Sequence, residues 1–339
     1  MEKKSDSIAW LAKQDGTVVM GYGPFAASAE PCLADVSFYV QNFGLEDPLP
    51  WKTPSCIERT TTLKLASQIK NFIALECKWS PLDAARFAEV FQEIMNSING
   101  GILEKTVPVV TEIAKTLGSP REAILEAMIR QAHPLYSYGW LGSGSGFAGA
   151  TPELLFALRG KHLETMALAG TARSEDRDVF AVDEKEIREH EYVAQALVDK
   201  MLDLGSVHRC SRKILDLGSI VHFLTTFQMD LESAHAPESL IRRFHPTPAL
   251  GPLPRTDQTM ALLLEWRKRL GCPAEFGAPF GLWDQGEFHA VVAIRGVWWK
   301  KQELKLPAGC GIIEASRLVN EWRELRLKRE SVKSFLSPG

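Results

Sequence analysis

The sequence lacks the features that would place the protein in a membrane, on nucleic acid or in a disulfide-bonded scaffold. The charge-free residues 134–152 are rich in glycine and serine, whereas a transmembrane helix needs about 20 predominantly apolar residues. No long basic block is present, and 39 Lys and Arg against 42 Asp and Glu give a formal net charge of −3, so the clustered cations that nucleic acid requires are missing. The six cysteines are scattered without a CxxC pair, which argues against zinc, redox and disulfide sites.

These absences favour a soluble cytoplasmic protein with reduced thiols. Residues 1–6 run into no long apolar core, so we predict no secretory signal. A length of 339 residues, with 45% hydrophobic and 24% charged residues, fits an ordinary globular protein. We expect neither nucleic acid nor a membrane as a partner.

Hydrophobic periodicity and capping residues predict long helices and several strands that do not alternate regularly. The predicted helices cover residues 80–99, 119–133, 183–204 and 316–335. The predicted extended segments cover residues 102–110, 136–140, 153–158, 162–168, 288–299 and 303–306. Because strands and helices cluster, the pattern favours an α+β fold over a doubly wound parallel sheet.

The predicted helix 183–204 begins with five acidic residues within nine positions. Acids near a helix N-terminus are stabilising, and a solvated first turn would explain most of them. However, Glu186, Glu189 and His190 share a face with Leu197, so at least one carboxylate should lie where the buried face begins. An acid in that position needs a cation.

The predicted C-terminal helix carries a second acidic face. Glu321, Glu324 and Lys328 lie at positions i, i+3 and i+7, next to Leu325. A surface ion pair between Glu324 and Lys328, worth about 0.3–0.5 kcal/mol, is one explanation. The alternative is that the two helices share a hard divalent cation, because Mg²⁺ accepts one or two carboxylates and keeps several waters.

Three further charged side chains lie in or beside apolar extended segments. Arg295 ends the run 291–295, a position that suits either solvation or bidentate carboxylate binding. If Lys105 were buried it would have a lowered pKa and could act as a base, and a buried Glu153 would have a raised pKa and could donate a proton. Surface exposure is the alternative. The glycine-rich residues 308–311 could form a tight turn or a backbone anion site.

Together these segments resemble the chorismate-utilising enzymes, a family that includes isochorismate synthase, salicylate synthase and the large chains of anthranilate and aminodeoxychorismate synthases. The resemblance covers the chain from about residue 100 to the C-terminus, with its motifs in register. The motifs are 149–155 (GATPELL), 168–173 (LAGTAR), 185–191 (KEIREHE), 221–222 (VH), 245–251 (HPTPALG), 280–284 (FGLWD), 291–295 (VVAIR), 308–313 (AGCGII) and 321–328 (EWRELRLK).

The resemblance implies large antiparallel β-sheets packed in a sandwich and flanked by helices, as in anthranilate synthase component I. Residues 1–99 would be a shortened N-terminal part of the same body, and residues 100–339 would be the chorismate-binding catalytic region. Together they would form one structural domain.

The resemblance also implies a set of roles at the site. Mg²⁺ would be held by Glu189 and Glu324, with Glu321 acting through water. Lys105 would activate the water that attacks ring carbon C2, and Glu153 would protonate the hydroxyl that leaves C4. The residues that would bind chorismate are Gly170, Thr171, His222, Arg295, Gly309 and Lys328.

Three positions favour isochorismate synthase within the family. Ala169 stands where aminodeoxychorismate synthases carry a nucleophilic lysine, Phe276 aligns with a tyrosine of several lyase relatives, and residues 245–248 (HPTP) are typical of isochorismate synthases. We therefore expect no glutamine amidotransferase subunit and a possible monomer. Salicylate synthase, an ammonia-using large chain and a non-catalytic chorismate-binding subunit are the alternatives. The pathway, whether menaquinone, siderophore or salicylate synthesis, stays open.

One segment departs from the family pattern. After the catalytic lysine the family usually reads KVVLAR, whereas this chain reads KTVPVV from Lys105. The arginine is absent, and Pro108 has no backbone N–H to donate to a neighbouring strand. We therefore expect a strand edge or a bulge beside Lys105.

Overall fold

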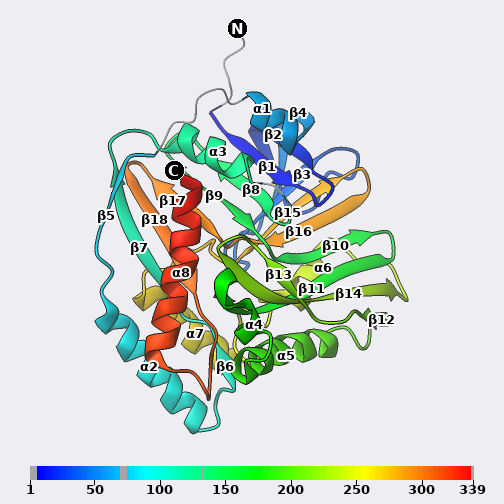
Figure 1. Ribbon diagram of the computed structural model, residues 1–339. Helices are drawn as coiled ribbons and strands as arrows, with labels where there is room; N and C mark the ends of the chain where they lie inside the picture. The colour runs from blue at the N-terminus through cyan, green and yellow to red at the C-terminus, as the bar shows by residue number, and fades with distance from the viewer. Residues whose placement is uncertain (1–5, 69–74, 132, 337–339) are drawn as a thin grey trace.

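The computed structural model describes residues 6–68, 75–131 and 133–336 (Figure 1). Seventeen strands form one connected antiparallel network, and helices cover its outer faces. The predicted α+β class is therefore confirmed. Among the described residues, no helix combines the length and the apolar character needed to cross a bilayer. The division into residues 1–99 and 100–339 stays a prediction.

When the strands are followed from one hydrogen-bonded neighbour to the next, the N-terminal strands connect two larger groups of strands, the first and second halves of the sheet. The first half contains β5 (Cys77–Trp79), β7 (Val109–Thr116), β18 (Glu303–Gly309), β17 (Gly296–Lys300), β9 (Ser145–Thr151) and β8 (Tyr136–Leu141). The joining strands are β1 (Ile8–Ala12), β2 (Thr17–Ser28), β4 (Trp51–Thr61) and β3 (Ser37–Val40). The second half contains β15 (Pro279–Asp284), β16 (Glu287–Val292), β10 (Leu154–Arg159), β11 (His162–Arg173), β14 (Ile220–Leu231), β12 (Gly205–Arg209) and β13 (Lys213–Asp216).

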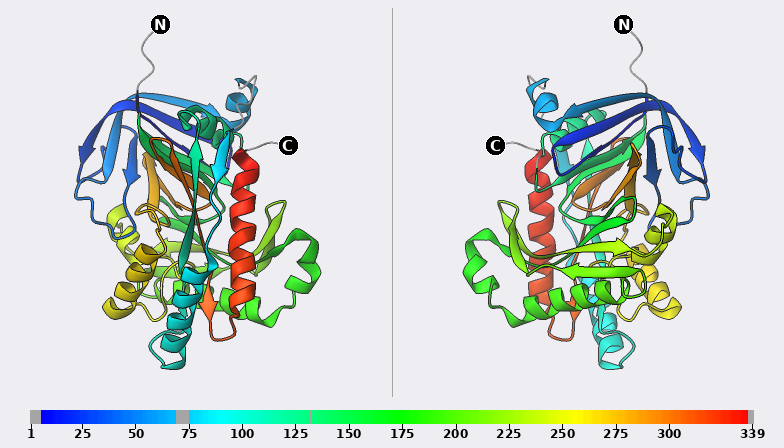
Figure 2. Two further views of the ribbon diagram at one scale, coloured as in Figure 1. Left: turned by 90° about the vertical axis from the view of Figure 1, so that its left-hand side faces the viewer. Right: turned by 90° about the vertical axis from the view of Figure 1, so that its right-hand side faces the viewer.

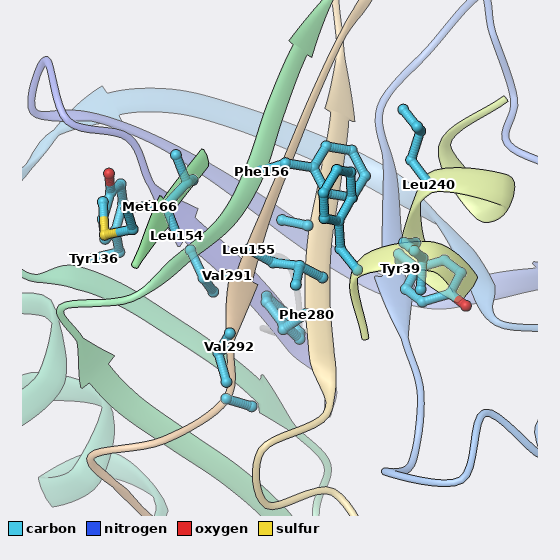
Figure 3. Close-up of a cluster of buried hydrophobic side chains, with 14 of the residues drawn as sticks. Tyr39, Tyr136, Leu154, Leu155, Phe156, Met166, Leu240, Phe280, Val291 and Val292 are labelled. Carbon is cyan, nitrogen blue, oxygen red and sulfur yellow. The ribbon is translucent and has the colours of Figure 1, made fainter. Parts of the chain in front are cut away.

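The two halves pack face to face around the main hydrophobic core. Successive side chains of a strand point to opposite faces, so Leu11 of β1 enters this core while Trp10 enters a second core under the helices. The rings of Phe147 on β9 and Phe280 on β15 lie 5.9 Å apart across the core. Figure 3 shows Phe280 with Tyr136 of β8 among the side chains of this cluster. The predicted sandwich is confirmed, as a sheet that folds back on itself.

The described helices flank the sandwich. They are α1 (Thr62–Gln68), α2 (Ala84–Asn99), α3 (Arg121–Ile129), α4 (Arg177–Phe180), α5 (Glu184–Asp199), α6 (Pro237–Phe244), α7 (Asp257–Arg269) and α8 (Leu318–Leu336). Figure 2 shows α8 running along one side of the molecule. The predicted start at residue 80 is wrong, because the Asp83 side chain accepts a hydrogen bond from Ala85 N–H and caps α2 there.

Two predicted extended segments are each divided in two beside the site. Residues 288–299 do not form one strand: β16 and β17 are separated by a turn in which Arg295 has a φ of 54°. Residues 102–110 are divided by Pro108 into β6 (Lys105–Thr106) and β7. β6 leaves the large sheet and pairs with β19 (Ile312–Ile313), so Pro108 lies between two strands.

Candidate active site

A small cavity is lined by residues of β11, β14, β18, α5 and α8. Its lining includes Ala169 and Phe276. The predicted site residues that line it are Glu153, Gly170, Thr171, Glu189, His222, Arg295, Gly309 and Lys328. Lys105, Glu321 and Glu324 lie outside this lining. The structure therefore brings together side chains that lie up to 175 positions apart in the sequence, from Glu153 to Lys328.

Glu153 is a buried carboxyl group directly before β10. Its side chain is 2% exposed, and the Thr247 hydroxyl donates a hydrogen bond of 2.8 Å to its Oε1. Burial raises the pKa of Glu153 to about 7, although the Thr247 hydrogen bond opposes this shift. A substantial part of Glu153 therefore carries a proton near neutral pH and can donate it.

Lys105 is a fully buried amine on β6. Its Nζ donates a hydrogen bond of 2.8 Å to the carbonyl of Pro248. Burial lowers the pKa of Lys105 to about 8, against the opposing effect of Glu189. About a tenth of Lys105 is then the neutral amine at pH 7.

The segment HPTP at residues 245–248 holds both groups. Thr247 contacts Glu153 through its hydroxyl, and the next residue, Pro248, contacts Lys105 through its carbonyl. The backbone of Lys105 also accepts a hydrogen bond of 2.8 Å from Leu253 N–H, just beyond this segment. One loop thus sets the positions of the candidate acid and the candidate base.

His222 and Arg295 form a buried hydrogen-bonded pair beside the cavity. His222 Nδ1–H donates to the carbonyl of Gly170 at 2.7 Å, which leaves Nε2 as the acceptor for Arg295 Nη2, also at 2.7 Å. Burial and the Arg295 charge hold the pKa of His222 well below its usual value, so the imidazole is neutral. Burial lowers the pKa of Arg295 to about 10, which leaves it charged at neutral pH.

Four carboxylates converge where α5 and α8 begin. Lys185 Nζ lies 2.9 Å from Glu186 Oε1, 3.1 Å from Glu189 Oε2 and 3.4 Å from Glu321 Oε1. Glu186 Oε2 also accepts a hydrogen bond of 2.8 Å from Thr171 N–H. The predicted convergence of the two acidic faces is therefore present, and it includes Glu186, to which sequence reasoning assigned no role.

The remaining members of the cluster lie on α8. Glu321 is 1% exposed, and the cation that pairs with it in the described residues is the ammonium of Lys185, 3.4 Å from its Oε1. Burial and the Glu324 charge raise the pKa of Glu321 to about 8. Burial also favours the neutral form of Glu324, but the ammonium of Lys328, 2.5 Å from Glu324 Oε1, outweighs it and lowers the pKa.

The donor set fits a hard divalent cation. Four carboxylates face two ammonium groups, so the ionised cluster has a charge of 2 − 4 = −2, which one divalent ion would offset. All the donors are carboxylate oxygens, the ligands that Mg²⁺ prefers, and Oε2 of Glu321, which does not contact Lys185, adds capacity. Glu189, Glu321 and Glu324 are therefore suited to the role that the resemblance gives them.

Gly311 is a further site residue, and sequence reasoning noted it only as part of a glycine-rich turn. A Cβ atom at this position would lie 2.0 Å from Glu189 Oε1 and 3.3 Å from Lys105 Cε. Glycine is therefore required for the carboxylate and the amine to approach the same backbone. Two residues earlier, at the end of β18, the carbonyl of Gly309 accepts a hydrogen bond of 2.9 Å from Lys328 Nζ.

The comparisons with known proteins identify the family. The family model described as "Chorismate binding enzyme" matches residues 52–337. The chain belongs to the chorismate-binding enzyme family. Isochorismate synthase EntC of Escherichia coli K12 is 30% identical over 241 residues, which are 67% of this chain and 59% of that protein. Isochorismate synthase MenF of Bacillus subtilis is 28% identical over 229 residues, which are 63% of this chain and 47% of that protein.

The matches therefore cover about half the length of these curated relatives. Two solved structures confirm the fold. MenF, the menaquinone-specific isochorismate synthase of Escherichia coli, has a TM-score of 0.83 at 18% identity, covering 99% of this chain and 90% of that chain. Anthranilate synthase component I of Streptococcus pneumoniae has a TM-score of 0.68 at 15% identity, covering 91% of this chain and 81% of that chain.

Proposed function

We propose that this chain is an isochorismate synthase, an isomerase that converts chorismate to isochorismate with Mg²⁺ as cofactor. One observation carries the proposal: Lys105 has a pKa lowered to about 8 and Glu153 a pKa raised to about 7, and one loop holds both. Such a pair suits the removal of one proton and the delivery of another near neutral pH. A protein that only bound chorismate would need neither group.

The reaction balances with these two residues alone as proton carriers. Lys105, as the neutral amine, removes a proton from the water that attacks C2 of the ring. The ring double bonds shift, the C4–O bond breaks, and Glu153 donates its proton to the hydroxyl, which leaves as water. One water enters and one water leaves, so substrate and product are isomers. Lys105 is then charged and Glu153 ionised, and a proton passes back before the next turnover.

Binding of the substrate would depend on cations around the cavity. Chorismate carries two carboxylates, and Arg295 and Lys328 both line the cavity. Gly170 and Gly309 contribute backbone to the same lining, where no side chain obstructs a bound carboxylate. Neutral His222 accepts a hydrogen bond from Arg295 and so orients it. Because His222 carries no negative charge, it leaves the positive charge of Arg295 available to the substrate carboxylate. Fixing the ring in this way places C2 and C4 relative to the base and the acid.

The carboxylate cluster would hold the metal. Glu189 and Glu324 would bind it directly and Glu321 through water. When bound, Mg²⁺ supplies positive charge that offsets and orients a carboxylate of the substrate. The chain's own contribution is to keep these acids buried, with Glu189 at the cavity wall and Gly311 leaving space for it.

The product tests the proposal. Purified protein is incubated with chorismate and Mg²⁺, and the mixture is separated by chromatography for isochorismate, salicylate, pyruvate and, with ammonium present, anthranilate. We expect isochorismate as the only product, without ammonium or a second subunit. Salicylate with pyruvate would make the chain a salicylate synthase, and anthranilate would make it an ammonia-using large chain. Intact chorismate would make it a non-catalytic binding subunit. Glu153→Gln is the inactive control.

We infer further that the enzyme works in the cytoplasm, as a monomer and without a glutamine amidotransferase. All six cysteines are free thiols in the structure, in keeping with a reducing compartment. Its product would be available for menaquinone or siderophore synthesis. Sedimentation of the purified enzyme at the mass of a single chain, with full turnover, is the expected result, and turnover only as a larger assembly would contradict it.

A further inference from the structure

The ammonium of Lys185 lies among the carboxylates that would bind the metal. It contacts Glu186, Glu189 and Glu321 within 3.4 Å, and its side chain is 21% exposed. These ion pairs stabilise the ammonium where it lies. Lys185 therefore carries its charge inside the cluster, whereas the other cation, Lys328, is held at the edge by Glu324 and the carbonyl of Gly309.

The carboxylates are arranged around this ammonium and not around a metal position. In the described residues, no three His, Cys, Asp or Glu side chains are placed to hold one ion together. Mg²⁺ requires oxygens at about 2.0–2.1 Å in a near-octahedral arrangement, which is tighter than the 2.9–3.4 Å contacts of Lys185. Glu189 Oε2 and Glu321 Oε1 face the ammonium of Lys185. A metal ion and the ammonium therefore cannot both contact these two oxygens at the same time.

The structure also provides space for Lys185 outside the cluster. A pocket of about 800 Å³ adjoins the cluster: Lys185 lines it together with three of the carboxylates, and the lining extends to Asp176 and Asp183. A lysine side chain has four rotatable carbons and little rotamer preference at its end, so the ammonium can move while the backbone of α5 stays in place. The lining also includes the arginines Arg173, Arg317, Arg323 and Arg326 beside the exposed acids, so a displaced ammonium would be stabilised there mainly by water.

We propose that Lys185 is an internal counter-cation that competes with Mg²⁺ for these carboxylates and moves to the outer pocket when the ion binds. The inference rests on the Mg²⁺ dependence in the proposed function. In the metal-free enzyme Lys185 keeps the buried acids paired and prevents the start of α5 and α8 from separating by charge repulsion. The same contacts set an upper limit on Mg²⁺ affinity, because binding of the ion must first displace the ammonium.

Mg²⁺ titration of the metal-free protein tests this competition without any substrate. The variants are Lys185→Met, which removes the ammonium and keeps the chain length, and Arg188→Gln as a matched control. Arg188 lies on the same helix and its loss changes the net charge equally, but its side chain is 51% exposed and pairs with Glu314. Isothermal titration calorimetry gives the Mg²⁺ dissociation constant, and thermal unfolding with and without Mg²⁺ gives stability.

We expect Lys185→Met to bind Mg²⁺ on the order of tenfold more tightly than the wild type, with a much smaller change in Arg188→Gln, because an exposed charge is screened. Without metal, Lys185→Met should unfold at a lower temperature than the wild type, and saturating Mg²⁺ should remove the difference. If the variant is folded only with Mg²⁺, that also supports the proposal, and Lys185→Gln repeats the titration with a polar side chain.

Unchanged or weaker Mg²⁺ binding by both Lys185 variants would overturn the proposal and make Lys185 a fixed partner of the acids. Absence of Mg²⁺ binding by the wild type would overturn it as well. Failure of the proposed function is a separate result, since it is read from the products of chorismate turnover, whereas the titration contains no chorismate.

Discussion

Arg295 Nη2 lies 2.7 Å from Nε2 of His222, and this hydrogen bond leaves the guanidinium oriented but not neutralised. Arg295 is 8% exposed and its backbone has a φ of 54°, so the turn between β16 and β17 directs a buried cation to the cavity. A buried arginine paired with a neutral imidazole retains its full charge for an anion.

Replacing Arg295 by glutamine should therefore weaken the binding of chorismate. We expect kcat/KM to fall roughly 10- to 150-fold, mainly through KM, because a hydrogen bond to a charged group contributes about 1.5–3 kcal/mol. Steady-state kinetics measures both constants. Arg159→Gln, at an 81% exposed arginine paired with Glu287, is the control that should leave them unchanged. A loss of less than twofold in Arg295→Gln would contradict the role of Arg295.

Lys105→Met should make the protein more stable and nearly inactive. Removing the general base should lower kcat by roughly 10²–10⁴-fold. At pH 7 the wild type buries Lys105 mainly in its charged form, although burial lowers its pKa from 10.5 to about 8. This shift corresponds to a loss of about 3 kcal/mol in the free energy of unfolding, which methionine avoids. Loss of the Pro248 hydrogen bond offsets about 1 kcal/mol of this gain.

The pH dependence of that stability difference has a definite sign. Below pH 8 the destabilisation of the wild type by Lys105 is complete, and it declines as the pH rises from 8 towards 10.5, where both states lose the proton. Denaturant unfolding at pH 7 and pH 9.5 measures it. Lys305→Met, at a partly exposed lysine paired with Glu303, is the control. A Lys105→Met protein with near wild-type kcat would show that another group is the base.

The activity should depend on pH through two groups with reversed protonation. Glu153, with a pKa of about 7, must be protonated, and Lys105, with a pKa of about 8, must be neutral. The enzyme form with protonated Glu153 and neutral Lys105 is most abundant midway between the two pKa values, at about pH 7.5. Its abundance falls roughly 20-fold two pH units to either side. The profile of kcat/KM against pH measures this.

Thr247→Val should shift that profile in a known direction. The Thr247 hydroxyl hydrogen bond lowers the pKa of Glu153, so its loss should raise this pKa and move the optimum to higher pH. A flat profile between pH 5.5 and pH 9.5, or a shift to lower pH in Thr247→Val, would be incompatible with the assigned acid.

Gly311→Ala should disturb the metal site with little effect elsewhere. The added methyl group would lie 2.0 Å from Glu189 Oε1, so the carboxylate must move away from the cluster. We expect Mg²⁺ affinity and turnover to fall together, by roughly tenfold or more. Gly144→Ala, in the β8–β9 turn with no atom within 4 Å of the new Cβ, is the control. If Mg²⁺ binding were unchanged in Gly311→Ala, Glu189 would not be a ligand.

Local patterns predicted the parts of the site that lie on single helices. The spacing of Glu186 and Glu189, and of Glu321 and Glu324, follows from helix geometry, and each pair indeed lies at the start of a buried face. For Lys105 the sequence left burial and exposure as alternatives, and the structure buries it fully.

Long-range contacts and special backbone conformations could not be read from the sequence. The apolar run around Arg295 has the pattern of one strand, and only the left-handed conformation of Arg295 divides it. The contact between Thr247 and Glu153 joins residues 94 positions apart. The occupation of the acidic cluster by Lys185 depends on the distance between two helices, which no single-helix pattern contains.

The most direct test of the account is the origin of the product's hydroxyl group. Chorismate is incubated with the wild-type protein and Mg²⁺ in water enriched in ¹⁸O, and the product is analysed by mass spectrometry with localisation of the label. Attack of water at C2 predicts isochorismate carrying one ¹⁸O atom at C2, and no such product with Lys105→Met or Glu153→Gln. Isochorismate without label, formed by transfer of the original hydroxyl, would contradict the assignment of Lys105 as the base that activates water.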